Sequence, residues 1–312
     1  MRFSRKFWIP VAALLIFALL ASGCTQRFTY KQVSLKPSAR ETPGTASASE
    51  SAALRVAVAA ILSPQTTTHG YDRLVAYLTS QLNRPVRLVQ RATYAETNEL
   101  VRTRQVDLAF VCTGAYIQGH KQFGLELLAV PQIAGQTTYR SYIIVPANSP
   151  AQTVDDLRGH VFAFTDPLSL SGYLVPLHML ATENKGTSDT YFSRTLFTYG
   201  HENSIKAVAE GWVDGAAVDS LVYDATVAEK PDYGRKTRVI WASVPYGAPP
   251  VVVHPALDAA TKDALRRLLL HMHETEEGRS ALAPLGVDRF VPADDRLYDS
   301  ARAVIDTLGG TP

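Results

Sequence analysis

Residues 160–173 read HVFAFTDPLSLSGY, an apolar strand followed by a turn and then by a helical segment that runs to Ala181. The first turn of a helix leaves backbone N–H groups without partners at the positive end of the helix dipole, which favours a bound anion. Ser169 and Ser171 add hydroxyl donors, and Gly172 allows a ligand to approach the backbone. Because serine before a helix is also a common N-cap, an ordinary cap is the alternative for this turn.

The same order of elements occurs twice in the chain. Each half runs strand, helix, strand, helix, strand, and its last strand begins Val106-Asp107-Leu108-Ala109 in one half and Val213-Asp214-Gly215-Ala216 in the other. Strands that alternate with helices in this way form parallel sheets with right-handed crossovers. The sequence therefore predicts an α/β protein of two lobes, each a mostly parallel sheet flanked by helices.

Two extended segments connect these lobes. The strand-like residues 139–146 lead out of the first half, and residues 238–244 lead back toward the apolar run Val251-Val252-Val253. Two crossings between lobes make a hinge. We expect the first lobe to comprise residues 54–143 and 246–312, and the second lobe to comprise residues 144–245.

Two helices of the first lobe are expected from the local pattern. A loop rich in Ser and Thr at residues 63–68 precedes a helix that opens at Gly70-Tyr71 and ends at Leu82. Another helix, over about residues 259–277, is expected to pack on the first lobe.

Ligands of open α/β sheets bind beyond the carboxyl ends of the strands, where loops enter helices. This rule selects corresponding loops in both lobes, and we expect their hydroxyls and helix N-termini to face one cleft. Such a cleft favours a small oxyanion, held by several charge-assisted hydrogen bonds of about 1.5–3 kcal/mol each. The candidate ligand-binding residues are Thr67, Tyr94, Thr113, Tyr116, Ser169, Ser171, Gly172, His201 and Asp219.

Several of these candidates have an equally ordinary structural role. His201 could donate to an anionic oxygen, or it could cap its helix or lie on the surface. Asp219 could accept from a ligand amine or a protonated ligand oxygen, or it could cap the following helix. Tyr94 and Tyr116 would supply phenolic hydroxyls and an aromatic wall, although tyrosines in such loops are often only packed side chains.

The amino terminus resembles a bacterial lipoprotein signal. Arg2, Arg5 and Lys6 precede an apolar run that ends in Ala21-Ser22-Gly23-Cys24, and the run is shorter than the roughly 20 residues of a spanning helix. We expect residues 1–23 to be a signal peptide, Cys24 to be lipidated, and residues 24–53 to be a flexible tether. The protein would then be a membrane-anchored lipoprotein that faces the periplasm or the extracellular side.

Composition excludes several kinds of partner and cofactor. Cys112 is the only cysteine besides Cys24, so no internal disulfide and no zinc or iron–sulfur site are expected. The chain has 31 Lys and Arg against 29 Asp and Glu, and residues 1–23 hold three of the basic ones, which leaves a formal charge near −1. Such a surface does not attract nucleic acid. We expect a monomer without metal or cofactor.

Three motifs resemble the phosphate/phosphite/phosphonate substrate-binding proteins of ABC importers. They are the segment Val106-Asp107-Leu108-Ala109-Phe110 with Gly114 and Tyr116, the segment 166–176 with its Asp-Pro-x-Ser-x-Ser-Gly-Tyr-x-x-Pro pattern, and His201-Glu202-Asn203-Ser204 followed by residues 213–219. The resemblance runs from about Leu54 to Val291. It implies a type II periplasmic-binding-protein fold that closes around its ligand and delivers it to an ABC permease.

The resemblance also implies which groups hold the phosphonate oxygens: hydroxyls and amides matching Ser169, Ser171 and Gly172, a histidine matching His201, and first-lobe tyrosines matching Tyr94 and Tyr116. The chain departs from the family at Leu170, where many members have Thr, and at Thr113-Gly114, where the family has Gly-Pro. These departures affect the identity of the ligand more than the fold.

The favoured function is a binding protein for phosphonate, phosphite or a phosphate-like oxyanion that feeds an ABC importer. A sensory receptor with the same cleft is the alternative. A hydrolase is disfavoured because the chain has no Gly-x-Ser-x-Gly elbow and no His-Glu-x-x-His motif. A ferric-ion site built from tyrosines is a weaker idea.

Overall fold

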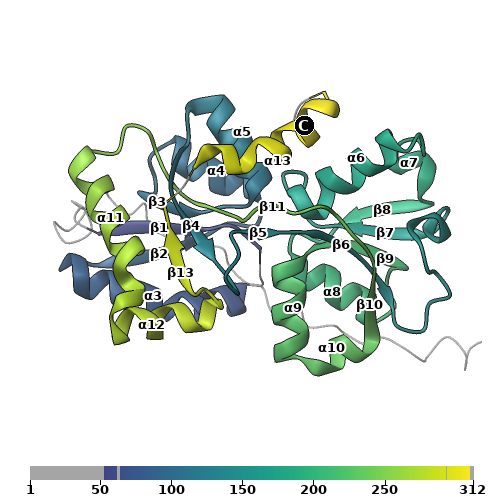
Figure 1. Cartoon of the computed structure of the whole chain (residues 1–312), viewed down its shortest axis with the longest axis horizontal. Coiled ribbons are helices and arrows are strands. Elements are labelled where there is room, and N and C mark those ends of the chain that lie inside the picture. The colour runs from purple at the N-terminus through teal and green to yellow at the C-terminus, as the bar shows by residue number, and fades with distance from the viewer. Residues whose placement is uncertain (1–52, 62–63, 293, 310–312) are drawn as a thin grey trace, which may run out of the picture. The chain divides into compact units, whose positions relative to one another are not determined.

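The computed structural model describes residues 53–309 apart from 62–63 and 293. Within this part the chain forms two main sheets, each with helices on both faces (Figure 1). The first sheet contains, in spatial order, β13 (Arg289–Val291), β4 (Glu126–Gln132), β12 (Val251–Val253), β3 (Leu108–Phe110), β1 (Leu54–Val58) and β2 (Val86–Gln90). The second contains β10 (Thr237–Ala242), β6 (Ser141–Pro146), β9 (Gly215–Asp219), β7 (Val161–Phe164) and β8 (Arg194–Phe197). The α/β fold with two lobes is confirmed.

The repeated sequence pattern builds the same parallel core in each sheet. β1 lies between β2 and β3 and pairs in parallel with both, and β7 lies between β8 and β9 in the same way. Antiparallel strands extend each core on one side: β12, β4 and β13 in the first sheet, β6 and β10 in the second. The carboxyl ends of β1, β3, β7 and β9 therefore lead into the helices that build the site.

Helices cover both faces of each sheet. Those of the first lobe are α3 (Pro64–Leu82), α4 (Tyr94–Arg102), α5 (Thr113–Phe123), α11 (Ala259–His271), α12 (Glu276–Leu282) and α13 (Asp299–Thr307). Those of the second lobe are α6 (Val175–Thr182), α7 (Ser188–Tyr191), α8 (His201–Ala209), α9 (Ser220–Glu229) and α10 (Pro231–Lys236). In Figure 1, α4 and α5 lie above the first sheet with α3 and α12 below it, while α6 and α7 lie above the second sheet with α8, α9 and α10 below.

The alternation of side chains along β1 explains this layering. Val56 points to the core shared with α3 and α12, which contains Leu74, Leu78 and Leu282. Ala57 points to the opposite core. A strand that is buried on both faces must be apolar along its length, as Leu54-Arg55-Val56-Ala57-Val58 nearly is.

Two predicted helices differ in the structure. α3 begins at Pro64, not at Gly70, so the Ser/Thr-rich residues from 64 onward form its first turns. Proline is favoured at the first helical position, and this outweighs the low helix propensity of the threonines that follow. The long helix expected over 259–277 is divided: α11 ends at His271, a 3₁₀ turn covers Met272–Glu274, and α12 begins at Glu276.

The two crossings between the lobes pair with each other. β5 (Thr138–Tyr139) and β11 (Tyr246–Gly247) form a short antiparallel ribbon in which Tyr246 lies opposite Tyr139. Each then continues into or out of the second sheet through β6 and β10. The hinge is therefore a paired element, and the residue bounds of the lobes stay a prediction.

Direct contacts join the lobes beside this ribbon. The amide N–H of Tyr94 donates to Asp166 Oδ2 at 3.1 Å, and the amide N–H of His201 donates to the carbonyl oxygen of Ile61 at 3.1 Å. The Thr66 hydroxyl donates to Glu202 Oε2 at 3.1 Å. Each bond spans the two lobes, so this arrangement of the lobes is a closed one.

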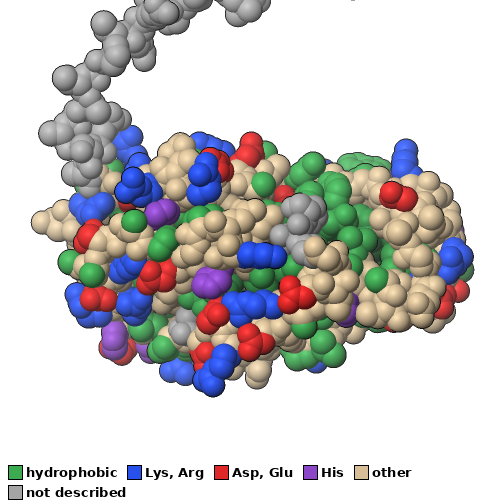
Figure 2. Space-filling view, turned by 90° about the horizontal axis from the view of Figure 1, so that it is seen from above, with side chains coloured by type: hydrophobic (Ala, Val, Ile, Leu, Met, Phe, Trp, Pro, Cys, Tyr) green, Lys and Arg blue, Asp and Glu red, His purple; other side chains and the backbone are tan. Residues whose placement is uncertain are grey.

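The signal peptide, Cys24 and the tether up to residue 52 lie outside the described residues. Among the helices that the structure describes, none is long and apolar enough to cross a membrane. Figure 2 shows the upper face of the molecule. Over the first lobe, Lys and Arg side chains on this face are interspersed with Asp and Glu side chains. That face carries no continuous basic stripe.

Gly114→Ala tests a close contact between the lobes. A Cβ atom at position 114 would lie 2.3 Å from the carbonyl oxygen of Leu168 and 3.1 Å from the amide nitrogen of Leu170. Backbone atoms cannot turn aside as a side chain can, so we expect the free energy of unfolding in denaturant titration to fall by about 1–3 kcal/mol.

Gly70→Ala is the matched control. It lies inside α3, where the nearest atom to an added Cβ is Leu285 Cδ2 at 3.5 Å, and we expect no loss, or a gain of up to about 1 kcal/mol. Equal losses in both variants would contradict the requirement for glycine at the interlobe contact.

Candidate functional site

Three buried hydroxyls have no hydrogen-bond partner among the described residues. They belong to Tyr94 at the start of α4, Tyr139 at the end of β5, and Ser171 in the π-helical turn Leu170–Leu174 that precedes α6. All three side chains are 2% exposed or less. Buried polar groups are nearly always paired, so unpaired hydroxyls drawn from both lobes and the hinge mark a candidate binding site.

These hydroxyls belong to one cluster. Burial raises the pKa of Tyr139 well above its usual value, and the nearby hydroxyls of Thr113 and Ser171 oppose this rise. Neither of them forms a hydrogen bond with the Tyr139 hydroxyl. Burial likewise raises the pKa of Tyr94, with Cys112, Asp166, Asp219 and Tyr139 as further causes. We call Tyr94, Thr113, Tyr139 and Ser171 the hydroxyl cluster.

Thr113 fixes this cluster to the hinge. It is the first residue of α5 and is buried, and its hydroxyl donates to the carbonyl oxygen of Gly247 in β11 at 2.8 Å. The preceding Cys112 is a buried free thiol, whose pKa burial raises to about 11. The backbone N–H groups of Leu170 and Gly114 lie close enough to that sulfur to oppose the rise.

His201 is buried beside Asp219 as a neutral imidazole. Burial lowers the pKa of His201 to about 3. Its Nδ1 accepts from the amide N–H of Asp219 at 3.0 Å, and it lies 3.1 Å from the hydroxyl of Thr165. An amide N–H can only donate, so Nδ1 carries no proton and the ring proton is on Nε2, which leaves Nε2 as a donor.

Asp219 ends β9 and caps α9. Its Oδ1 accepts from the amide N–H groups of Leu221 at 2.7 Å and Val222 at 3.3 Å. Burial raises the pKa of this carboxyl to about 7, although both backbone hydrogen bonds oppose the rise. Its role as the cap of α9 therefore does not exclude a ligand contact at Asp219.

Ser169 and Gly172 have a structural role in the same turn. Ser169 Oγ accepts from the amide N–H of Gly172 at 3.0 Å, which is an N-cap bond. A Cβ at position 172 would lie 2.5 Å from Thr165, so close packing requires the glycine there. The hydroxyl of Ser171, rather than that of Ser169 or the amide of Gly172, is the group without a protein partner.

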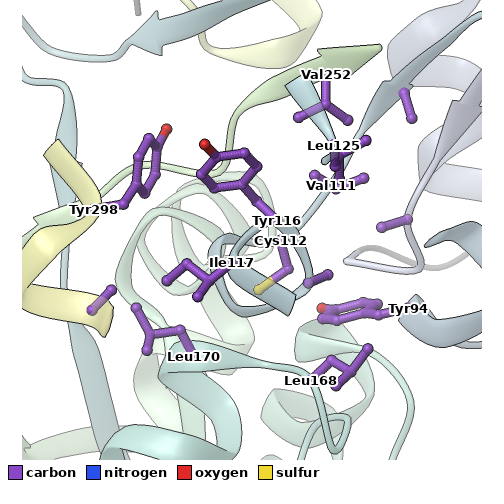
Figure 3. Close-up of a cluster of buried hydrophobic side chains, with 14 of the residues drawn as sticks. Tyr94, Val111, Cys112, Tyr116, Ile117, Leu125, Leu168, Leu170, Val252 and Tyr298 are labelled. Atoms are coloured by element: carbon purple, nitrogen blue, oxygen red, sulfur yellow. The ribbon is translucent and has the colours of Figure 1, made fainter. Parts of the chain in front are cut away.

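Tyr116 lies apart from the cluster. Its hydroxyl donates to Asp295 Oδ1 at 2.5 Å, and its ring packs on Tyr298 with centroids 4.9 Å apart. Figure 3 shows Tyr116 and Tyr298 together on one side of Cys112, with Tyr94 on the other side near Leu168. The structure brings together Tyr94, Thr113, Ser171, His201 and Asp219, but not Tyr116.

An interlobe cleft of about 740 Å³ reaches Asp219 but is not lined by the hydroxyl cluster itself. Thr67 of α3 and Asp219 line it, as does Val111, next to Cys112. Most other lining side chains are apolar, many of them from α9 and the segment before β13. The charged or titratable ones are His69, Tyr71, Glu202, Asp219 and Glu229. No Lys or Arg is among the described residues that line it.

Sequence reasoning missed Tyr139. It stands in an extended run that reads as one strand, residues 139–146, whereas the structure breaks the run at Arg140 between β5 and β6. No motif marks this tyrosine, and only its place in the hinge ribbon brings it to the cluster. Among the described residues, no group of three or more His, Cys, Asp or Glu could hold a metal ion.

The chain is similar to known substrate-binding proteins. The family model of the periplasmic substrate-binding proteins of phosphonate ABC transporters matches residues 56–298. The phosphonates-binding periplasmic protein of Escherichia coli is 29% identical over 208 residues, which cover 65% of this chain and 61% of that protein. The phosphate-import protein PhnD of Mycolicibacterium smegmatis is 29% identical over 260 residues, which cover 77% of this chain and 80% of that one.

Solved structures agree on the fold. A binding component of a phosphonate ABC transporter from Pseudomonas aeruginosa has a TM-score of 0.77 at 24% identity, covering 81% of this chain and 85% of its own. PhnD1 of Prochlorococcus marinus, solved with methylphosphonate, has a TM-score of 0.75 at 18% identity, covering 83% of this chain and 98% of its own. These neighbours confirm the type II periplasmic-binding-protein fold.

The unpaired hydroxyls can be tested through stability. Tyr139→Phe and Tyr94→Phe remove a buried hydroxyl that no protein group satisfies, so we expect the free energy of unfolding without ligand to stay unchanged or to rise. Tyr298→Phe is the matched control, because its buried hydroxyl donates to the carbonyl oxygen of Ala248 at 2.9 Å. It should lose about 1–3 kcal/mol in denaturant titration. Similar losses at all three positions would contradict the assignment.

Proposed function

Because the chain belongs to the family of periplasmic substrate-binding proteins of phosphonate ABC transporters, we propose that it captures a small phosphorus oxyanion between its lobes and delivers it to an ABC importer. The family consists of binding proteins, so the chain is not an enzyme. One observation carries the choice of ligand: the unpaired hydroxyls of Tyr94, Tyr139 and Ser171 converge from two lobes and the hinge.

The donors match a phosphorus oxyanion in number and kind. Three phenolic or alcoholic hydroxyls and the Nε2–H of His201 are neutral donors in a buried site, and Thr113 lies among them. Each hydrogen bond to a charged oxygen contributes about 1.5–3 kcal/mol, so several together offset the dehydration of the anion. Ser169 and Gly172 contribute by holding the turn that carries Ser171.

The cleft favours an oxyanion that carries an organic substituent. Its volume of about 740 Å³ is far more than a bare oxyanion needs, and its walls are mostly apolar. Thr67 lies on the wall formed by α3. A phosphonate has a carbon bonded to phosphorus that would project into this space, whereas phosphite and phosphate have none.

Closure of the lobes would hold the bound ligand between them. The bonds Tyr94 N–H to Asp166 and Thr66 to Glu202 form only when the lobes meet, and Tyr94 also supplies a hydroxyl to the cluster. A ligand that binds groups of both lobes therefore stabilises the closed form that a permease would recognise. The proposed lipid anchor at Cys24 would hold a monomer beside that permease, on the periplasmic or extracellular side.

Isothermal titration calorimetry of the mature chain tests the proposal. We expect methylphosphonate, phosphite or phosphate to bind, and Ser171→Ala, Tyr139→Phe and His201→Ala each to weaken binding by about tenfold or more, because each removes one bond to a charged oxygen. Tyr298→Phe should leave the affinity unchanged. Wild-type protein that binds no phosphorus oxyanion, or site variants with unaltered affinity, would overturn it.

The apolar cleft predicts a trend with substituent size. Burial of one methylene contributes about 0.8 kcal/mol, so affinity should rise up to about fourfold per carbon from methyl- to butylphosphonate. Ala225→Trp, on the face of α9 that lines the cleft, should weaken butylphosphonate and spare methylphosphonate. If affinity falls with chain length in the wild type, the cleft does not hold the substituent.

A further inference from the structure

Pro176 removes the donor that the π-helical pattern would give to the carbonyl oxygen of Ser171. In the turn Leu170–Leu174, backbone bonds run five residues back along the chain, as from the amide N–H of Val175 to the carbonyl oxygen of Leu170. The next donor in this series would be residue 176, which is a proline and has no N–H. The Ser171 carbonyl is buried, so it needs a donor from another element.

Ser141 supplies that donor from the hinge. Its hydroxyl donates to the carbonyl oxygen of Ser171 at 2.6 Å, and both residues are fully buried. Ser141 is the first residue of β6 and follows the first crossing between the lobes directly. Loss of a donor leaves a buried carbonyl unsatisfied at a cost in free energy, so this bond holds the turn to the end of the hinge.

The two crossings meet at Ser141. Its amide N–H donates to Ser243 Oγ at 2.9 Å, and the amide N–H of Ser243 donates back to the carbonyl oxygen of Ser141 at 3.0 Å. Ser243 follows β10 on the second crossing, and the guanidinium of Arg140 donates to its carbonyl oxygen. Groups of both crossings therefore fix Ser141, and a movement of either crossing would reach the turn that carries Ser171.

The bond from Ser141 also limits the spacing of two hydroxyls of the hydroxyl cluster. Tyr139 lies two residues before Ser141 on the same crossing, and two residues of chain span at most about 7 Å. The Ser141 hydroxyl ties this short segment to the backbone of Ser171 itself. A few covalent bonds and one hydrogen bond thus connect the two unpaired hydroxyls, those of Tyr139 and Ser171.

We propose that Ser141 is a positioning residue of the ligand site. Its hydroxyl proton is used by the Ser171 carbonyl, and this bond orients the turn so that the hydroxyls of Ser171 and Tyr139 face the same oxyanion. The inference rests on the proposed function, because it concerns the ligand of that same site. It goes further by making the geometry of the donors depend on the hinge, through a residue that does not itself bind the ligand.

A double-mutant cycle with Ser171→Ala tests this role. In calorimetry with methylphosphonate, phosphite and phosphate, we expect Ser141→Ala to weaken binding to the wild-type chain by about three- to tenfold, because the turn loses its anchor. In the Ser171→Ala chain the same change should alter the affinity by less than about twofold, since the hydroxyl that Ser141 positions is gone. Losses that multiply, or unchanged affinity in Ser141→Ala, would overturn the inference.

Pro176→Ala supplies a rescue. Alanine has an amide N–H that continues the π-helical series to the Ser171 carbonyl, so Ser141→Ala should alter the affinity of the Pro176→Ala chain by less than about twofold. A merely structural role of Ser141 elsewhere in the hinge would not respond to this backbone donor. An undiminished loss in the Pro176→Ala chain would contradict the contact through which Ser141 is proposed to act.

Tyr191→Phe is the matched control, because its buried hydroxyl donates to the carbonyl oxygen of Val154 at 2.9 Å in the second lobe, outside the hinge. It should leave the affinity unchanged with and without Ser171→Ala. If Ser141→Ala does not fold, Ser141→Cys carries the same cycle, since a thiol is a weak donor of similar shape. If the wild type binds no phosphorus oxyanion, the proposed function fails; if it binds one and the losses multiply, only this inference fails.

Discussion

Buried hydroxyls without partners constrain this structure more than any other feature. Each unsatisfied hydroxyl costs about 1–3 kcal/mol, and Tyr94, Tyr139 and Ser171 bring three of them together where the lobes meet. An anion that accepted from all three would stabilise the closed form. In the proposed function the same groups would both bind the ligand and favour closure of the lobes.

The hinge is part of the site and not only a link. β5 and β11, which connect the lobes, pair with each other. Tyr139 ends β5, and the carbonyl oxygen of Gly247 in β11 accepts from the Thr113 hydroxyl. A change in the ribbon would move the Tyr139 hydroxyl and the start of α5 together. In the proposed function this would couple ligand contact to the relative position of the lobes without a separate transmitting element.

The repeat in the sequence predicted the parallel cores, because the order of elements and the Val-Asp-x-Ala starts of the third strands determine which strands can pair. It also predicted that these loops meet, and the structure brings Tyr94, Ser171, His201 and Asp219 together; their ligand-binding role stays a prediction. It could not separate Tyr116 from Tyr139, since chain position locates a loop but not the direction of a side chain. The start of α3 at Pro64 was missed because threonines suggest a loop until the proline before them is counted as a helix start.

The buried position of Cys112 beside the hydroxyl cluster affects the chemical stability of its thiol. Its thiol is buried, with a pKa of about 11, and the turn of the second lobe that carries Leu170 covers it. Oxidants and alkylating reagents attack the thiolate, so burial under this turn protects the sulfur, and parting of the lobes would remove that cover. In an oxidising compartment, the chemical lifetime of the protein would then depend on how much of the time its ligand keeps it shut.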